Sequence, residues 1–133
     1  MPAPAKAYAY NQTRQTYLAT ELRVADTHRS RFVGLLGTSA RDFVSGKGLW
    51  IVPCRGVHTL GMRFAIDVVY LDSGKAVVHV EQNLAPWRLA PVRLRAASVM
   101  ELPPNTIRQT DTRIGDAIEI GMGTRGTADE RSS

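Results

Sequence analysis

The residue types that can do chemistry gather in one stretch of the chain, from Gly48 to Asp72. This stretch holds the only cysteine, one of three histidines, and an acid inside an apolar run. Its candidate ligand-binding residues are Cys54, Arg55, His58, Thr59, Arg63 and Asp67. We expect any binding site of the protein to lie here.

Non-covalent recognition of an anion is the chemistry that these residue types favour. Arg55, His58, Thr59 and Arg63 offer hydrogen-bond donors suited to phosphate or carboxylate. The neighbouring glycines let backbone amides approach a ligand closely. The stretch therefore predicts a small binding or accessory protein that takes a small anionic ligand at residues 54–67.

A thiol- and histidine-dependent hydrolase is the enzymatic alternative, with Cys54 and His58 as the reacting pair. That chemistry needs the imidazole within hydrogen-bond reach of the sulfur, in a cleft. A lone cysteine after a strand is more commonly a small core residue. The sequence leaves enzymatic activity open and assigns no catalytic residue.

A metal or other cofactor is not expected. A structural zinc site needs four ligands, and Cys54 and His58 supply only two. Asp67 or His79 would have to supply the remaining ligands.

The positive charge raises a third alternative, a nucleic-acid-associated protein. The net charge is +5, and Arg88, Arg93 and Arg95 form a local basic concentration. No recognised nucleic-acid motif accompanies them, so charge alone does not predict such a partner. Clustering of these three arginines on one exposed face would favour this alternative.

Asp67 interrupts the apolar run Ile66–Leu71, and this pattern predicts a buried carboxylate. A buried carboxylate needs a partner, because desolvation of an unpaired charge is costly. The neighbouring Arg63 or His58 is the partner that the sequence predicts.

The 133 residues predict one domain over residues 8–121, with flexible tails at 1–7 and 122–133. The N-terminus lacks the apolar core of a secretory signal, and no stretch approaches the ~20 apolar residues of a membrane span. We expect a cytoplasmic protein without a membrane partner. The oligomeric state is not determined by the sequence.

Short apolar or alternating runs predict about six strands. Their ranges are 17–24, 48–52, 66–71, 76–80, 98–102 and 117–120. Leu18, Leu22 and Val24 are predicted to share one face of the first strand, and 66–71 is predicted to be a central strand followed by a hairpin.

Two short helical segments are predicted beside these strands. Asp26 or Thr27 can cap a helix that carries Phe32, Leu35 and Leu36 and ends at Gly37, and 103–109 can hold one turn. No strand–helix alternation is present, so the fold class is mainly β. We expect a small antiparallel β-sandwich or distorted barrel with one or two short helices.

Several motifs then occur in an order that resembles a known family. They are Arg31-x-x-Gly34-Leu35-Leu36, Gly48-Leu49-Trp50, HTLGMRFAIDVVYLD, Val99-Met100-Glu101-Leu102 and Ile114-Gly115-Asp116. Together they resemble the bacterial and archaeal domain of unknown function 192, over roughly residues 16–120. The resemblance implies a small, mainly β domain and implies no activity.

The chain departs from the common pattern of that family in one place. The pattern has Trp followed by Met-Lys-Asn-Thr, then proline before the hydrophobic-Asp strand, whereas this chain has His58-Thr59-Leu60-Gly61-Met62 and Ala65. The chain therefore resembles a Cys-x-x-x-His-Thr variant, and roles of the common lysine and asparagine do not transfer to it.

Overall fold

The computed structural model describes residues 6–26, 39–123 and 125. Its elements are β1 (Ala7–Asn11), β2 (Thr16–Ala25), β3 (Lys47–Ile51), β4 (Ile66–Leu71), β5 (Val77–Leu84), β6 (Ser98–Leu102), α2 (Thr106–Thr110) and β7 (Ile118–Met122). All six predicted strands are present, and so is the helical turn within 103–109. The other predicted helix, with Phe32, Leu35 and Leu36, lies outside the described residues.

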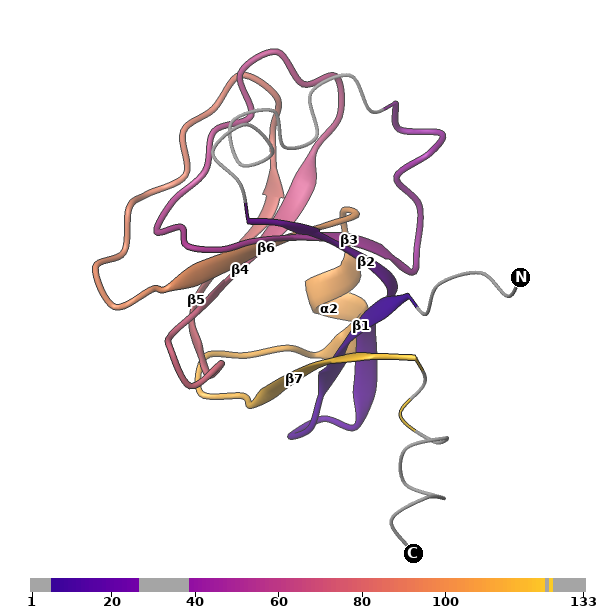
Figure 1. The fold of residues 1–133 in the computed structure, drawn as a ribbon. Coiled ribbons are helices and arrows are strands. Elements are labelled where there is room, and N and C mark those ends of the chain that lie inside the picture. Colours follow the sequence, from indigo (N-terminus) through magenta and orange to yellow (C-terminus); the bar gives the residue numbers. More distant parts are fainter. Residues whose placement is uncertain (1–5, 27–38, 124, 126–133) are drawn as a thin grey trace, which may run out of the picture.

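The strands form one sheet in the order β5-β4-β6-β3-β2-β1-β7. The sheet curls into a half-barrel (Figure 1). Its two outer strands approach each other at one end, where the Val77 N–H donates to the Asp116 carbonyl and the Ile118 N–H donates to the Lys75 carbonyl, both at 2.9 Å. The mainly β fold class is confirmed, and the shape is the distorted barrel rather than the sandwich.

Strand directions are antiparallel throughout except at one pair. β2 and β3 run parallel, with Leu22 opposite Gly48 and Ala25 opposite Ile51. A parallel pair requires a crossover connection, and residues 26–46 supply it. The sheet is therefore mainly antiparallel, as predicted, and this parallel pair is a feature that the sequence did not indicate.

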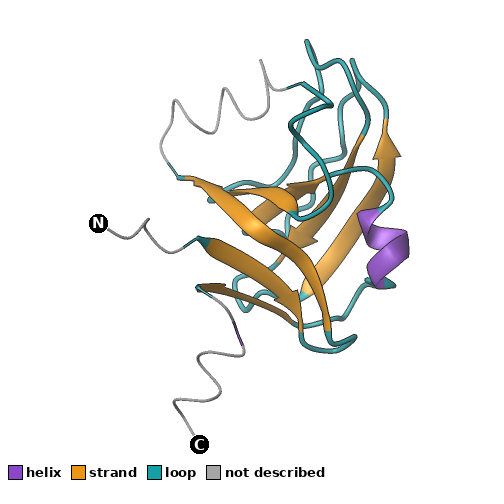
Figure 2. Cartoon of the chain, turned by 90° about the vertical axis from the view of Figure 1, so that its right-hand side faces the viewer, coloured by secondary structure: helices purple, strands orange, loops and turns teal. Residues whose placement is uncertain are grey.

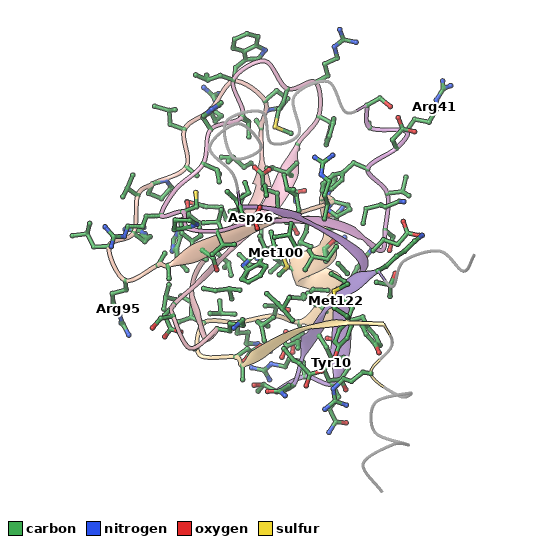
Figure 3. All side chains as sticks on the ribbon, viewed as in Figure 1. Tyr10, Asp26, Arg41, Arg95, Met100 and Met122 are labelled. Atoms are coloured by element: carbon green, nitrogen blue, oxygen red, sulfur yellow. The ribbon has the colours of Figure 1, made fainter. Side chains whose placement is uncertain are left out.

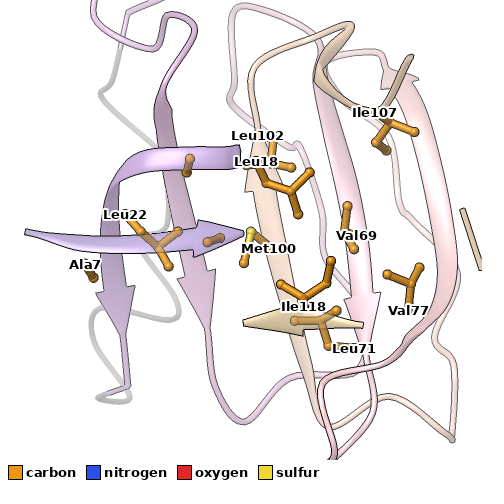
Figure 4. Close-up of a cluster of buried hydrophobic side chains, with 12 residues drawn as sticks. Ala7, Leu18, Leu22, Val69, Leu71, Val77, Met100, Leu102, Ile107 and Ile118 are labelled. Atoms are coloured by element: carbon orange, nitrogen blue, oxygen red, sulfur yellow. The ribbon is translucent and has the colours of Figure 1, made fainter. Parts of the chain in front are cut away.

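Buried apolar side chains lie on both faces of the sheet. The cluster inside the curl includes Leu18, Leu22, Val69, Met100 and Leu102 (Figure 4). A second cluster lies on the opposite face and includes Leu49, Ile51, Val68, Tyr70 and Val99. Successive residues of a strand point to opposite faces, so each central strand contributes to both clusters.

β4 shows this two-sided burial most completely, because all six of its residues are buried. Val69 and Leu71 belong to the cluster inside the curl, and Ile66, Val68 and Tyr70 to the outer cluster. β4 lies between β5 and β6 in the sheet. The predicted central strand is therefore confirmed, and loops must cover its outer face.

α2 is a short helix beside the sheet (Figure 2). Ile107 anchors it in the inner cluster with 2% of its surface exposed. Among the described residues, no helix is long and apolar enough to cross a membrane.

Two features of the N-terminal strands differ from the sequence predictions. β1 was not predicted, because alanine and tyrosine in AYAYN give a weak pattern; pairing with both β2 and β7 defines it. Val24 is 40% exposed rather than facing the core with Leu18 and Leu22. The pairing of β2 with β1 ends at Leu22 and contains register shifts, so simple alternation does not continue to Val24.

We expect Gly48→Ala to destabilise the fold. A Cβ at Gly48 would lie 3.0 Å from the Ala19 Cβ and 3.1 Å from methyl groups of Leu22 and Leu102. Overpacking of this kind costs roughly 1–3 kcal/mol, measurable as a lower midpoint of urea unfolding.

Gly74→Ala is the matched control, because an added Cβ there meets only the Asp72 Oδ1 at 3.5 Å. Its change in unfolding free energy should stay within about 0.5 kcal/mol. Equal midpoints for the two variants would show that the space around Gly48 is not tightly filled.

Candidate functional site

Two loops that are far apart in sequence lie together at one end of the half-barrel (Figures 1 and 2). We call residues 52–65 and 85–97 the loop lobe. Backbone bonds join the loops: Thr59 N–H to Arg88 carbonyl at 2.8 Å, Arg93 N–H to Arg55 carbonyl at 2.9 Å, and Cys54 N–H to Ala97 carbonyl at 3.0 Å. The two loops therefore run antiparallel to each other, and the predicted site belongs to a larger structure.

Thr59 fastens the two loops together. Its side chain is fully buried, and its hydroxyl donates to the Ala85 carbonyl at 2.6 Å while accepting from the Arg88 N–H at 2.8 Å. Its carbonyl also accepts from the Trp87 N–H at 2.9 Å. The donors and acceptors of Thr59 are thus engaged within the protein.

The inner side of the loop lobe covers the outer face of β4. Val57, Phe64 and Ala90 pack against the outer cluster. The buried Tyr70 hydroxyl donates to the Pro91 carbonyl at 2.7 Å. Burial raises the pKa of Tyr70 to about 12, so this hydroxyl stays a donor throughout the neutral range.

Cys54 is half-buried, and its thiol donates to the Gly56 carbonyl at 2.8 Å. His58 is exposed, and its backbone forms an isolated bridge with Leu89. The hydrogen bond of the thiol within this turn therefore runs to the backbone. A thiol is a weak hydrogen-bond donor.

No group of three or more His, Cys, Asp or Glu side chains in the described part of the chain is arranged to hold a metal ion. The absence of a metal or other cofactor remains a prediction.

The outer side of the loop lobe carries arginines. All five are exposed, and among the described residues none forms an ion pair; they are Arg55, Arg63, Arg88, Arg93 and Arg95. Arg95 extends into solvent at the edge of the molecule (Figure 3). The arginines predicted for anion binding and those predicted for nucleic acid thus belong to one lobe.

Charge is strongly concentrated in this lobe. It holds five of the 17 Lys and Arg residues and none of the 12 Asp and Glu residues. The remaining 12 basic residues equal the acidic residues in number, so the formal excess of +5 resides entirely in the loop lobe.

Asp67 is fully buried, as predicted, but its partners are different. Its Oδ1 accepts from the Asn83 N–H at 2.9 Å and its Oδ2 accepts from the Ile107 N–H at 2.8 Å. Neither Arg63 nor His58 forms an ion pair with it in the described structure. The sequence predicted the nearest cations in the chain, whereas two backbone amides from distant segments supply the donors.

These amides explain why a carboxylate is needed at this position. Asn83 has a φ of 53° within an irregular part of β5, and α2 begins after Asn105, whose side chain makes no capping bond. The first N–H groups of a helix lack intrahelical acceptors. Asp67 therefore accepts hydrogen bonds from backbone N–H groups of both β5 and α2, and these bonds hold the two elements against β4.

Glu101, within the Val99–Leu102 motif, is a second buried carboxylate. It is 3% exposed and lies between Leu49 and Val68 of the neighbouring strands. Its Oε1 has no hydrogen-bond partner among the described residues. Burial raises the pKa of Glu101 to about 7, and nearby Arg23 opposes this shift. A lone acid in the apolar strand SVMEL was the available signal.

Comparison with known proteins supplies relatives but no activity. The family profile of DUF192, described as an uncharacterized ACR, matches residues 9–120. A UPF0127 protein of Pyrococcus furiosus is 32% identical over 114 residues, which are 82% of this chain and 94% of the relative.

Two crystal structures share the fold. A protein of unknown function from Novosphingobium aromaticivorans has a TM-score of 0.73 at 14% identity, over 89% of this chain and 93% of that one. A Sinorhizobium meliloti protein, described as a suspected transcription regulator, has a TM-score of 0.70 at 18% identity, over 88% and 93%. At these identities the likeness concerns the fold alone.

Asp67→Asn should lower the free energy of unfolding by roughly 1–3 kcal/mol, because the amide cannot accept from both buried N–H groups. Urea unfolding measures this loss. Arg63→Ala and His58→Ala are the controls and should unfold like the wild type. If either control is as unstable as Asp67→Asn, the partner predicted from the sequence was correct.

Glu101 should make stability depend on pH. Its pKa is raised from 4.5 to about 7 on folding, so the folded state binds more protons between these values. Stability from this group is therefore full below about pH 4.5 and is lost as the pH rises through about 7.

Glu101→Gln removes that titration. The stability of the variant relative to the wild type should increase by roughly 2–3 kcal/mol between pH 4 and pH 8. Urea unfolding of both proteins across this range measures the difference between their free energies of unfolding. Any pH-independent effect of the substitution is the same at each pH and cancels when the two ends of the range are compared. Parallel pH profiles would contradict a raised pKa.

Proposed function

This chain belongs to the uncharacterised DUF192 family, and we propose that it acts there as a binding module for an anionic partner. The ligand groups are phosphate or carboxylate, and the binding surface is the outer side of the loop lobe. The observation that carries this proposal is the location of the whole formal charge excess on one lobe without a single acidic residue.

The bonding within the lobe supports a recognition surface rather than a disordered basic segment. The buried side chains of Thr59 and Tyr70 form hydrogen bonds to the backbone of the 85–97 loop and fix it from its inner side. The arginines are therefore carried on an ordered backbone, which reduces the entropy lost on binding. Guanidinium groups without an ion pair in the described part of the chain can form charge-assisted bonds with phosphate or carboxylate.

The proposal divides the candidate residues of the 54–67 segment into two roles. Arg55, His58 and Arg63 are exposed and are assigned to ligand contact. Cys54, Thr59 and Asp67 hydrogen-bond to the backbone and are assigned to the scaffold. The hydrolase alternative receives less support, because it needs the Cys54 thiol for His58 rather than for the Gly56 carbonyl.

Titration calorimetry with a soluble polyphosphate chain tests the proposal. We expect the wild type to bind, and its affinity to fall as salt is added, because exposed charges are screened. Arg93→Gln combined with Arg95→Gln should weaken binding about tenfold, or about 1.4 kcal/mol, in keeping with exposed pairs contributing under about 1 kcal/mol each.

Arg41→Gln combined with Arg108→Gln is the control of equal charge change. Both residues are exposed and lie outside the lobe, and Figure 3 shows Arg41 on the opposite side of the molecule from Arg95. The control should bind like the wild type. Equal weakening in both pairs would mean that net charge, not the lobe, governs binding.

A further inference from the structure

Large apolar side chains are also exposed on the loop lobe. Leu94 is 81% exposed, Leu89 74% and Trp87 66%, and Val92 and Leu60 add to them. Most exposed apolar residues in proteins are isolated, whereas contiguous groups mark interaction sites. Trp87 to Arg95 places four such side chains within one short segment.

These apolar residues alternate with the arginines. The segment reads Trp87-Arg88-Leu89, then Val92-Arg93-Leu94-Arg95. Backbone bonds from Trp87 and Arg93 to the other loop hold it as an exposed edge of the lobe. One ordered edge thus presents guanidinium groups and apolar side chains together.

An anionic lipid surface has the chemistry that fits this edge. Tryptophan and leucine side chains insert at the boundary between headgroups and acyl chains, and arginines bind the lipid phosphates. Aliphatic side chains gain little from nucleic acid, where bases stack on aromatic rings. Of the two large aromatic side chains of the lobe, Trp87 is exposed and Phe64 packs against the outer cluster.

A second copy of the chain fits less well. Two lobes brought together would place ten arginines in one interface, and the lobe has no acidic residue to pair with them. Like charges in contact oppose association.

We propose that the loop lobe docks the protein peripherally on an anionic phospholipid surface, with Trp87, Leu89 and Leu94 at the headgroup boundary. This inference rests on the proposed function and names its partner. It differs from the absence of a membrane partner expected from the sequence, because that expectation concerned spanning segments and docking requires none.

Vesicle binding tests the inference. The wild type should co-sediment with vesicles that contain phosphatidylglycerol. It should not co-sediment with vesicles of pure phosphatidylcholine. Each arginine near an anionic surface contributes roughly fivefold in affinity, so Arg93→Gln with Arg95→Gln should bind roughly 25-fold more weakly. Leu94→Ser should bind roughly tenfold more weakly, because a leucine side chain no longer leaves water.

Ile114→Ser is the matched control for Leu94→Ser. Ile114 is 64% exposed and lies in the turn before β7, outside the lobe. Its substitution should leave vesicle binding unchanged. If Leu94→Ser also leaves it unchanged, charge alone attracts the protein and the inference is wrong.

Tryptophan fluorescence gives a second readout. Trp87 should shift to shorter wavelength on anionic vesicles, and the shift should disappear in Trp87→Phe, which retains Trp50 in the sheet. A shift that persists in Trp87→Phe would overturn the assigned insertion.

The outcomes separate the two proposals. Binding of soluble polyphosphate without binding of anionic vesicles overturns the lipid inference and leaves the proposed function intact. If the protein binds polyphosphate and a single-stranded oligonucleotide tightly but does not bind anionic vesicles, nucleic acid is the partner. Failure of polyphosphate and vesicles alike overturns both proposals.

Discussion

The burial of β4 on both faces is the constraint from which the remaining structure follows. All six of its residues are buried, and the curl of the sheet covers only one face. Apolar side chains on the other face must also leave water, and each contributes roughly 1.5–3 kcal/mol when it does. The segments 52–65 and 85–97 provide that cover, so the loop lobe is part of the fold.

Loops that cover a hydrophobic core have buried backbone groups, and these groups need hydrogen-bond partners. Buried N–H and C=O groups are nearly always hydrogen-bonded. Here the two loops bond to each other, and the buried side chains of Thr59 and Tyr70 bond to backbone carbonyls of the 85–97 loop. Asp67 has the same role on the inner face, where it satisfies amides of β5 and α2. Of the polar residues singled out in the sequence, Cys54, Thr59 and Asp67 thus form hydrogen bonds to the backbone of the scaffold.

Each loop of the loop lobe is divided into an inner and an outer side. Apolar residues such as Val57 and Ala90 pack inward, and the charge of the arginines requires them to remain in water. The exposed edge would have no structural reason to carry tryptophan and leucine as well. Their exposure, on a backbone held by hydrogen bonds to buried side chains, is the observation from which we propose partner recognition.

The sequence by itself determined much of the secondary structure and the burial of Asp67. Local patterns sufficed for β4 and its hairpin with β5, since apolar runs and turn residues act over a few neighbours. A lone acid in an apolar run was enough to place Asp67 in the interior. The family resemblance over 16–120 agrees with the profile match over 9–120.

Only the tertiary structure decided which distant segments meet. The parallel pairing of β2 with β3, the strand β1, and the partners of Asp67 all depend on contacts between residues far apart in the chain. The loop lobe depends on such contacts too, because they bring Arg55 and Arg63 together with Arg88, Arg93 and Arg95. Periodicity and spacing report which face of an element is buried, but burial is non-directional and does not specify the element that covers it.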